Sequence, residues 1–154
     1  MLYPGAFAGG KGIQMSQRHV LLVEDNPGDA FLVQSMLGRV PGWDCRVTVH
    51  QRLDQALDTL QTEQFTLILV DLSLPDSHGL ETAVSVRNAA PDTPIVVLTG
   101  LDDHQVGVEA IRNGVQDYLN KNNLTPELLG RTLHHALERH ELVQSQEQLI
   151  ADLD

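Results

Sequence analysis

Apolar residues along this chain form short continuous runs separated by longer amphipathic stretches. Three runs are strongly aliphatic and end in polar residues: VLLVED (20–25), LILVD (67–71) and PIVVLTG (94–100). DYLNK (117–121) is a weaker run of the same kind, and CRVTVH (45–50) is less apolar. Continuous runs of this length are typical of parallel strands covered on both faces of a sheet. The pattern therefore predicts five strands, with 45–50 nearer an edge.

The stretches between these runs have the spacing of amphipathic helices, with apolar residues recurring every three to four positions. The expected helices cover residues 28–39, 52–61, 79–89 and 103–113. A further helix is expected from about Pro126 to the end, because Thr125 suits an N-cap and proline suits the first helical position. This order predicts an α/β fold: a doubly wound, five-stranded parallel sheet between two helix layers, with an extended C-terminal helix.

Polar residues stand where the predicted strands end, and sites in open parallel sheets form outside those carboxyl ends. These residues are Glu24, Asp25, Asp71, Thr99 and Lys121. Three neighbouring carboxylates raise one another's pKa, and a hard divalent cation such as Mg²⁺ relieves their repulsion. A carboxylate held in this way can act as a nucleophile towards a phosphoryl group, while cation and lysine neutralise the transferring oxygens. The spacing thus indicates phosphoryl chemistry at Asp71.

The segments VLLVEDNPGD, LVDLSLPDSHGLE, IVVLTG and DYLNK, in this order, resemble the strand-end motifs of the response-regulator receiver family. The resemblance covers roughly residues 18–140 and implies a flavodoxin-like (βα)5 fold. It implies that Asp71 is the phosphoacceptor. It also implies a Mg²⁺ site made by Glu24, Asp25, Asp71 and the backbone carbonyl of Ser73.

The same resemblance implies roles for three residues further along the chain. Thr99 matches the hydroxyl that reorients towards the phosphoryl group, and Lys121 matches the lysine that contacts it. Tyr118 resembles the aromatic switch residue whose ring moves inward when Thr99 is recruited. One position departs from the family, which usually has proline after this lysine, whereas Asn122 follows here. Because of this departure, the resemblance does not fix how far the Lys121 side chain extends towards Asp71.

The resemblance implies a phosphorylation-activated signalling switch of a two-component phosphorelay, not an enzyme beyond assisting its own phosphorylation and dephosphorylation. The phosphoryl group would come from a histidine kinase or a phosphotransfer protein. One alternative is an aspartyl-phosphate phosphatase or phosphotransferase, but such enzymes usually carry a second Asp where Ser73 stands. Another is a degenerate receiver that acts only as a protein-binding or dimerisation module.

The composition of the chain indicates which kinds of partner and which cellular compartment to expect. The chain of 154 residues carries 10 Lys and Arg against 21 Asp and Glu, a formal net charge of -11, which disfavours direct nucleic-acid binding. No run approaches the roughly 20 apolar residues that span a bilayer, so no membrane partner is expected. A single cysteine, Cys45, suits a reducing compartment, and we expect a cytoplasmic location.

The two ends of the chain differ from the middle. Residues 1–17 are rich in glycine without a steady period and predict a flexible N-terminal tail, followed by the receiver domain at 18–140. Residues 141–154 are expected to form a C-terminal helical extension. A four-three spacing links Leu129, Leu133, Ala136, His140, Val143, Glu147 and Ile150. The extension is expected to be either a coiled coil or a solvated tail. A coiled coil would either form a homodimer or lead to an output domain.

Overall fold

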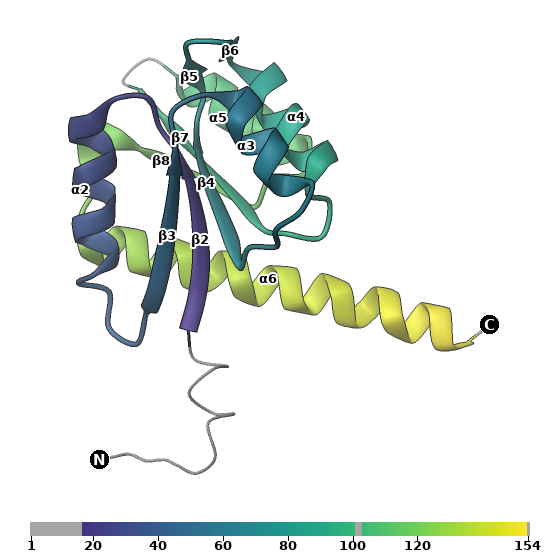
Figure 1. Cartoon of the computed structure of the whole chain (residues 1–154). Helices are drawn as coiled ribbons and strands as arrows, with labels where there is room; N and C mark the ends of the chain where they lie inside the picture. Colours follow the sequence, from purple (N-terminus) through teal and green to yellow (C-terminus); the bar gives the residue numbers. More distant parts are fainter. Residues whose placement is uncertain (1–16, 101–102, 154) are drawn as a thin grey trace.

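A single parallel sheet organises the computed structural model, which describes residues 17–100 and 103–153. Its five strands follow the order β3-β2-β4-β7-β8 (Figure 1). They are β2 (Gln17–Val23), β3 (Asp44–His50), β4 (Leu67–Asp71), β7 (Ile95–Thr99) and β8 (Asp117–Asn120). The less apolar β3 lies at an edge, as expected, and the wholly buried β4 and β7 lie inside the sheet. The predicted doubly wound sheet is therefore confirmed.

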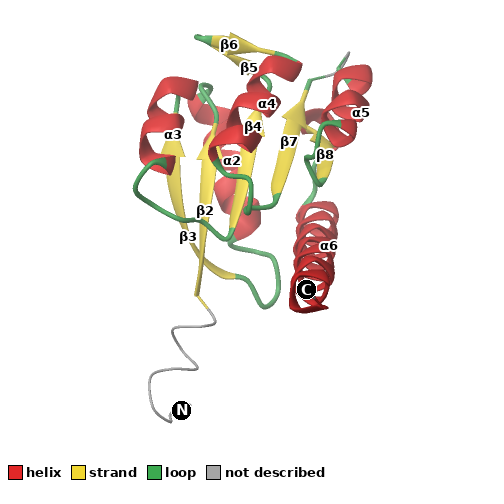
Figure 2. Ribbon diagram, turned by 90° about the vertical axis from the view of Figure 1, so that its right-hand side faces the viewer, coloured by secondary structure: helices red, strands yellow, loops and turns green. Residues whose placement is uncertain are grey.

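Helices cover both faces of this sheet (Figures 1 and 2). One layer holds α2 (Pro27–Leu37) and α6 (Pro126–Leu153), and the other holds α3 (Leu53–Leu60), α4 (Leu80–Ala89) and α5 (His104–Arg112). Successive strand residues point to opposite faces, so Leu21 packs in the core beneath α3 and α4 while Leu22 packs in the core beneath α2 and α6. This is why the inner strands are apolar without alternation.

Local capping fixes where the helices beside the sheet begin. The side chain of Asn26 accepts a hydrogen bond from the backbone N–H of Asp29 at 2.9 Å, and Pro27 opens α2. At α6 the hydroxyl of Thr125 accepts from the N–H of Leu128 at 3.1 Å, as the sequence predicts. Both caps satisfy backbone donors that a helix leaves free at its start.

Two short elements were not predicted. A small antiparallel hairpin, β5 (Ser73–Leu74) with β6 (Ser77–His78), follows β4 and stands at the top of Figure 2. After β8 comes the 3-10 turn η1 (Lys121–Asn123), whose first turn is capped by Asn120. The side chain of Asn120 accepts from the N–H of Asn122 at 2.8 Å. A proline at 122 has no N–H to donate, so the departure from the family has a local structural role.

The long helix α6 changes character along its length. Leu129, Thr132, Leu133 and Ala136 are buried against the sheet, whereas all of residues 141–153 are exposed. In Figure 1 this second half runs out past the sheet. The tail predicted at 1–17 lies, except for Gln17, outside the described residues. Among the helices of the described part, none is long and apolar enough to cross a membrane.

Candidate functional site

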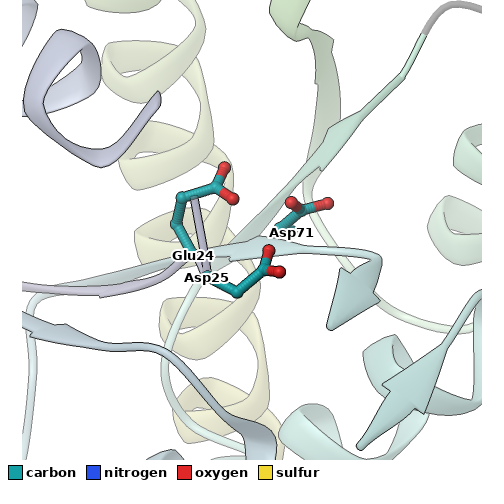
Figure 3. Close-up of side chains that lie close together, drawn as sticks. All are labelled: Glu24, Asp25 and Asp71. Atoms are coloured by element: carbon teal, nitrogen blue, oxygen red, sulfur yellow. The ribbon is translucent and has the colours of Figure 1, made fainter. Parts of the chain in front are cut away.

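Three carboxylates meet at the carboxyl end of the central strands. Glu24 and Asp25 directly follow β2, and Asp71 ends β4, whose residue Val70 is paired with Val23. One oxygen from each carboxylate lies within 4.8 Å of the others, and Figure 3 shows the three groups gathered around one space. Glu24 and Asp71 are only 1% and 4% exposed, while Asp25 is open to solvent. The predicted convergence is therefore present.

The ammonium group of Lys121 lies among these acids. Its Nζ is 3.0 Å from Glu24 Oε1, 3.0 Å from Asp71 Oδ2 and 2.9 Å from Asp29 Oδ2. Burial acts to lower the pKa of Lys121, but the hydrogen bonds to Asp29, Glu24 and Asp71 together raise it above its usual value. The lysine is therefore charged at neutral pH. It reaches Asp71 despite the asparagine that follows it.

Glu24 is the most perturbed acid of this group. Burial first, and then the neighbouring Asp71, raise its pKa to about 7, although Lys121 and the N–H of Asn26 act in the opposite direction. Lys121 thus pairs with three carboxylates, those of Glu24, Asp29 and Asp71, and the carboxylate of Asp25 lies beside two of them. Oxygen ligands with excess negative charge suit a hard divalent cation, so the donor set fits Mg²⁺.

The carboxylate of Asp71 is held at both oxygens. The backbone N–H of Ser73 donates to Oδ1 at 3.0 Å, and Lys121 donates to Oδ2 at 3.0 Å. Both hydrogen bonds fix the orientation of this carboxylate, and an ionised carboxylate oxygen can act as a nucleophile. Ser73 thus lies beside Asp71, and the use of its carbonyl as a metal ligand stays a prediction.

Thr99 and Tyr118 lie on the two strands beyond Asp71. Asp71 is paired with Leu98, so Thr99 at the end of β7 is one residue further along; it is 1% exposed. Its hydroxyl donates to the backbone carbonyl of Leu119 in β8, at 3.3 Å. Tyr118 is half-buried against α5, and its hydroxyl oxygen is 2.6 Å from Nδ1 of His104. Their roles as switch residues stay predictions.

Two acids outside the predicted site residues have defined contacts. Asp29, in the first turn of α2, binds Lys121, and its place four residues after Asp25 was the available signal. Asp76, in the loop after β5, accepts from the N–H groups of Leu53 and Asp54, both at 2.9 Å. It therefore caps α3 from outside that helix, which no local pattern indicates.

Comparison with known sequences identifies the family. Residues 20–133 match the family described as "Response regulator receiver domain". The chain belongs to this family. Among its relatives, the transcriptional regulatory protein ZraR of Klebsiella oxytoca is 30% identical over 129 residues, which are 84% of this chain and 28% of that protein. The response regulator protein PilR of Pseudomonas aeruginosa is 32% identical over 117 residues, 76% of this chain and 25% of that protein.

The fold agrees with this assignment. The receiver domain of the Francisella response regulator 1452 superposes with a TM-score of 0.66 at 24% identity, covering 79% of this chain and 98% of that one. This receiver domain spans about a quarter of the length of the two regulators just named. Receiver domains are the phosphorylation-activated switches of two-component response regulators, and this chain is one of them.

Proposed function

We propose that Asp71 accepts a phosphoryl group in a two-component phosphorelay, from the phosphohistidine of a histidine kinase or phosphotransfer protein. An oxygen of Asp71 attacks the phosphorus, the P–N bond of the donor breaks, and the donor imidazole leaves with its electron pair. The product is an acyl phosphate on Asp71. The observation that carries the proposal is the pairing of Asp71 with Lys121 beside Glu24 and Asp25.

Each neighbour of Asp71 has a distinct task in this proposal. Glu24, Asp25, Asp71 and the carbonyl of Ser73 would hold Mg²⁺, which neutralises charge on the phosphoryl oxygens when bound. Lys121 already contacts Asp71 and would pair with a phosphoryl oxygen. Thr99 would exchange its bond to Leu119 for one to the phosphoryl group, and the ring of Tyr118 would follow it inward. The surface of α5, β8 and α6 would then change its preference for partners.

Mass spectrometry of the intact chain with acetyl phosphate and Mg²⁺ tests this function. We expect one phosphoryl group per chain. The adduct should not form when Mg²⁺ is chelated before the donor is added, and it should be absent from Asp71→Asn. Asp58→Asn is the matched control, because Asp58 is an exposed acid on α3, away from the site. No adduct on the wild-type chain, or an adduct that persists in Asp71→Asn, would contradict the proposal.

The same incubation separates a switch from an enzyme. A receiver accumulates a stoichiometric adduct that decays slowly, whereas a phosphatase with an aspartyl-phosphate intermediate turns over phosphoesters continuously. We propose that this chain only assists its own phosphorylation and dephosphorylation. Sustained release of phosphate from a phosphoester in large excess over protein would favour the enzyme instead.

Partners beyond the phosphodonor are proposed from the exposed part of α6. Its second half carries Leu142, Val143, Leu149, Ile150 and Leu153, all exposed. This apolar stripe would contact either a second copy, as a homodimeric coiled coil, or an output domain or protein. We propose a cytoplasmic protein, because phosphodonor and Mg²⁺ are supplied there. Its net charge of -11 argues against direct nucleic-acid binding by this chain.

A further inference from the structure

Two features of α5 hold the half-buried ring of Tyr118 against that helix. Its hydroxyl oxygen lies 2.6 Å from Nδ1 of His104, the first residue of that helix, and the two rings meet edge to face at 5.5 Å between centroids. A hydrogen bond forms whichever group donates, since neutral or protonated imidazole can pair with a hydroxyl. The contact therefore persists across histidine tautomers.

The second feature is the absence of a side chain at Gly107, one turn further along α5. A Cβ built at this buried position would lie 2.6 Å from Cγ of Tyr118 and 2.7 Å from Cδ2. An aromatic Cγ cannot move aside without moving the whole ring, so the ring fits in this place only against glycine. Glycine inside a helix is otherwise unfavourable relative to alanine. The position is thus matched to this orientation of Tyr118.

We propose that His104 is a positioning residue that, with the glycine cradle at 107, biases the switch towards its unphosphorylated state. The inference rests on the proposed switch role of Tyr118. A group that binds only one of two conformations lowers the free energy of that conformation. A ligand that favours the other conformation must then supply this additional free energy through its own binding. The hydroxyl of Thr99 is likewise bonded to Leu119 rather than directed to Asp71 in this state. His104 therefore sets how readily phosphorylation draws the ring inward.

The test titrates the full chain with beryllofluoride, a phosphoryl analogue, in saturating Mg²⁺. The ring of Tyr118 is followed by NMR of ¹³C-labelled tyrosine. The chain has only two tyrosines, so Tyr118→Phe assigns the signal. His104→Phe keeps an aromatic edge but removes the hydrogen bond. A single neutral hydrogen bond corresponds to about a two- to tenfold change in an equilibrium. We expect His104→Phe to bind beryllofluoride tighter by about that factor.

Four further variants make the result specific. His134→Phe, at an exposed histidine of α6, should bind as the wild type does. His104→Gln, which can still pair with the hydroxyl, should restore most of the wild-type midpoint. Gly107→Ala should move the Tyr118 signal before any analogue is added. In a Tyr118→Phe background, His104→Phe should have no further effect, because the hydroxyl it acts on is gone.

The outcomes separate this inference from the proposed function. If the wild type binds beryllofluoride but His104→Phe has the same midpoint, or a weaker one, the inference is overturned while the function stands. An equal effect of His104→Phe with and without the tyrosine hydroxyl would also overturn it, since the histidine would then act only on packing. If the wild type binds no analogue, the proposed function falls and takes this inference with it.

Discussion

At the scale of single residues, the site is a balance between buried acids and one ammonium group. Glu24 and Asp71 are almost fully buried, and Lys121 donates to both. A buried charge that loses its partner is costly, whereas exposed pairs contribute little. Asp29, whose side chain is 40% exposed, therefore contributes less to stability than the two buried acids do. Lys121 is the residue on which the metal-free site depends.

Replacing Lys121 by methionine, of similar length, should destabilise the metal-free protein. We expect the free energy of unfolding to fall by about 1–3 kcal/mol, less than for a fully buried pair because the lysine side chain is 21% exposed. Mg²⁺ should then stabilise the variant more than the wild type, because its site has lost a competing cation. Urea denaturation with and without Mg²⁺ measures both effects.

Arg131→Met provides the control for this variant, since Arg131 is an exposed cation on α6 outside the site. It should change neither the stability nor the response to Mg²⁺. A Lys121→Met protein as stable as the wild type in chelator would mean that the acids do not depend on the lysine.

At the scale of elements, the helix α3 depends on a residue outside itself. Its own N-cap residue, Arg52, makes no side-chain capping bond. Asp76 instead accepts from the first two helical N–H groups. Burial acts to raise the pKa of Asp76, but these backbone bonds and Arg52 lower it below its usual value, so the carboxylate is ionised. The loop after Asp71 is thereby tied to α3.

Removing this cap should destabilise the fold. We expect Asp76→Ala to lower the free energy of unfolding by about 1–2 kcal/mol, the usual cost of losing a helix cap. Asp58→Ala, an exposed acid in the same helix, should have a much smaller effect. Chemical denaturation measures both, and equal effects of the two variants would contradict the capping role.

The free energy of unfolding should depend on pH through His19, which lies in β2 next to the paired strand β3. Its Nε2 is 2.7 Å from the hydroxyl of Thr48, and its ring lies 4.5 Å from that of Phe65. Burial first, then the guanidinium of Arg46, lower the pKa of His19 below 6.5, and Glu63 partly offsets this. The unfolded chain then binds this proton more readily, so stability is lost as pH falls through about 6.5.

The test measures the free energy of unfolding as a function of pH between pH 8 and pH 5. His19→Gln should reduce the acid-side loss, whereas His134→Gln, at an exposed position, should leave it unchanged. If the wild type and His19→Gln lose stability equally as the pH falls, groups other than His19 cause the pH dependence.

At the scale of the whole molecule, α6 has two halves with different surroundings. The first half completes the apolar core beneath α2, through Leu129, Leu133 and Ala136. The second half, from residue 141, is exposed throughout its described part. This change in burial supports the predicted end of the receiver domain at residue 140, which stays a prediction.

Truncation after His140 should therefore leave the fold intact. Because the removed residues bury no core side chain, we expect the free energy of unfolding to change by less than about 1 kcal/mol. Thermal denaturation by circular dichroism measures this. Sedimentation over a range of concentrations adds a second result, since only the full chain should self-associate if the exposed stripe binds a second copy. A truncated chain that fails to fold would contradict the division at residue 140.

Sequence patterns alone predict the order of strands and helices along the chain and the polar residues at the strand ends. Both follow from local pattern, because the apolar period identifies an element and parallel strands bring their ends to one edge. Glu24, Asp25, Asp71 and Lys121 were therefore predicted to meet, and they do.

Contacts that join distant segments follow no repeating pattern, so they become visible only in the folded structure. Asp29 and Lys121 are 92 residues apart, and Asp76 caps a helix that begins 23 residues before it. The bond between His104 and Tyr118 likewise depends on how closely α5 lies against β8, which Gly107 permits. Such contacts depend on distances between elements, and the order of residues within one element carries no information about those distances.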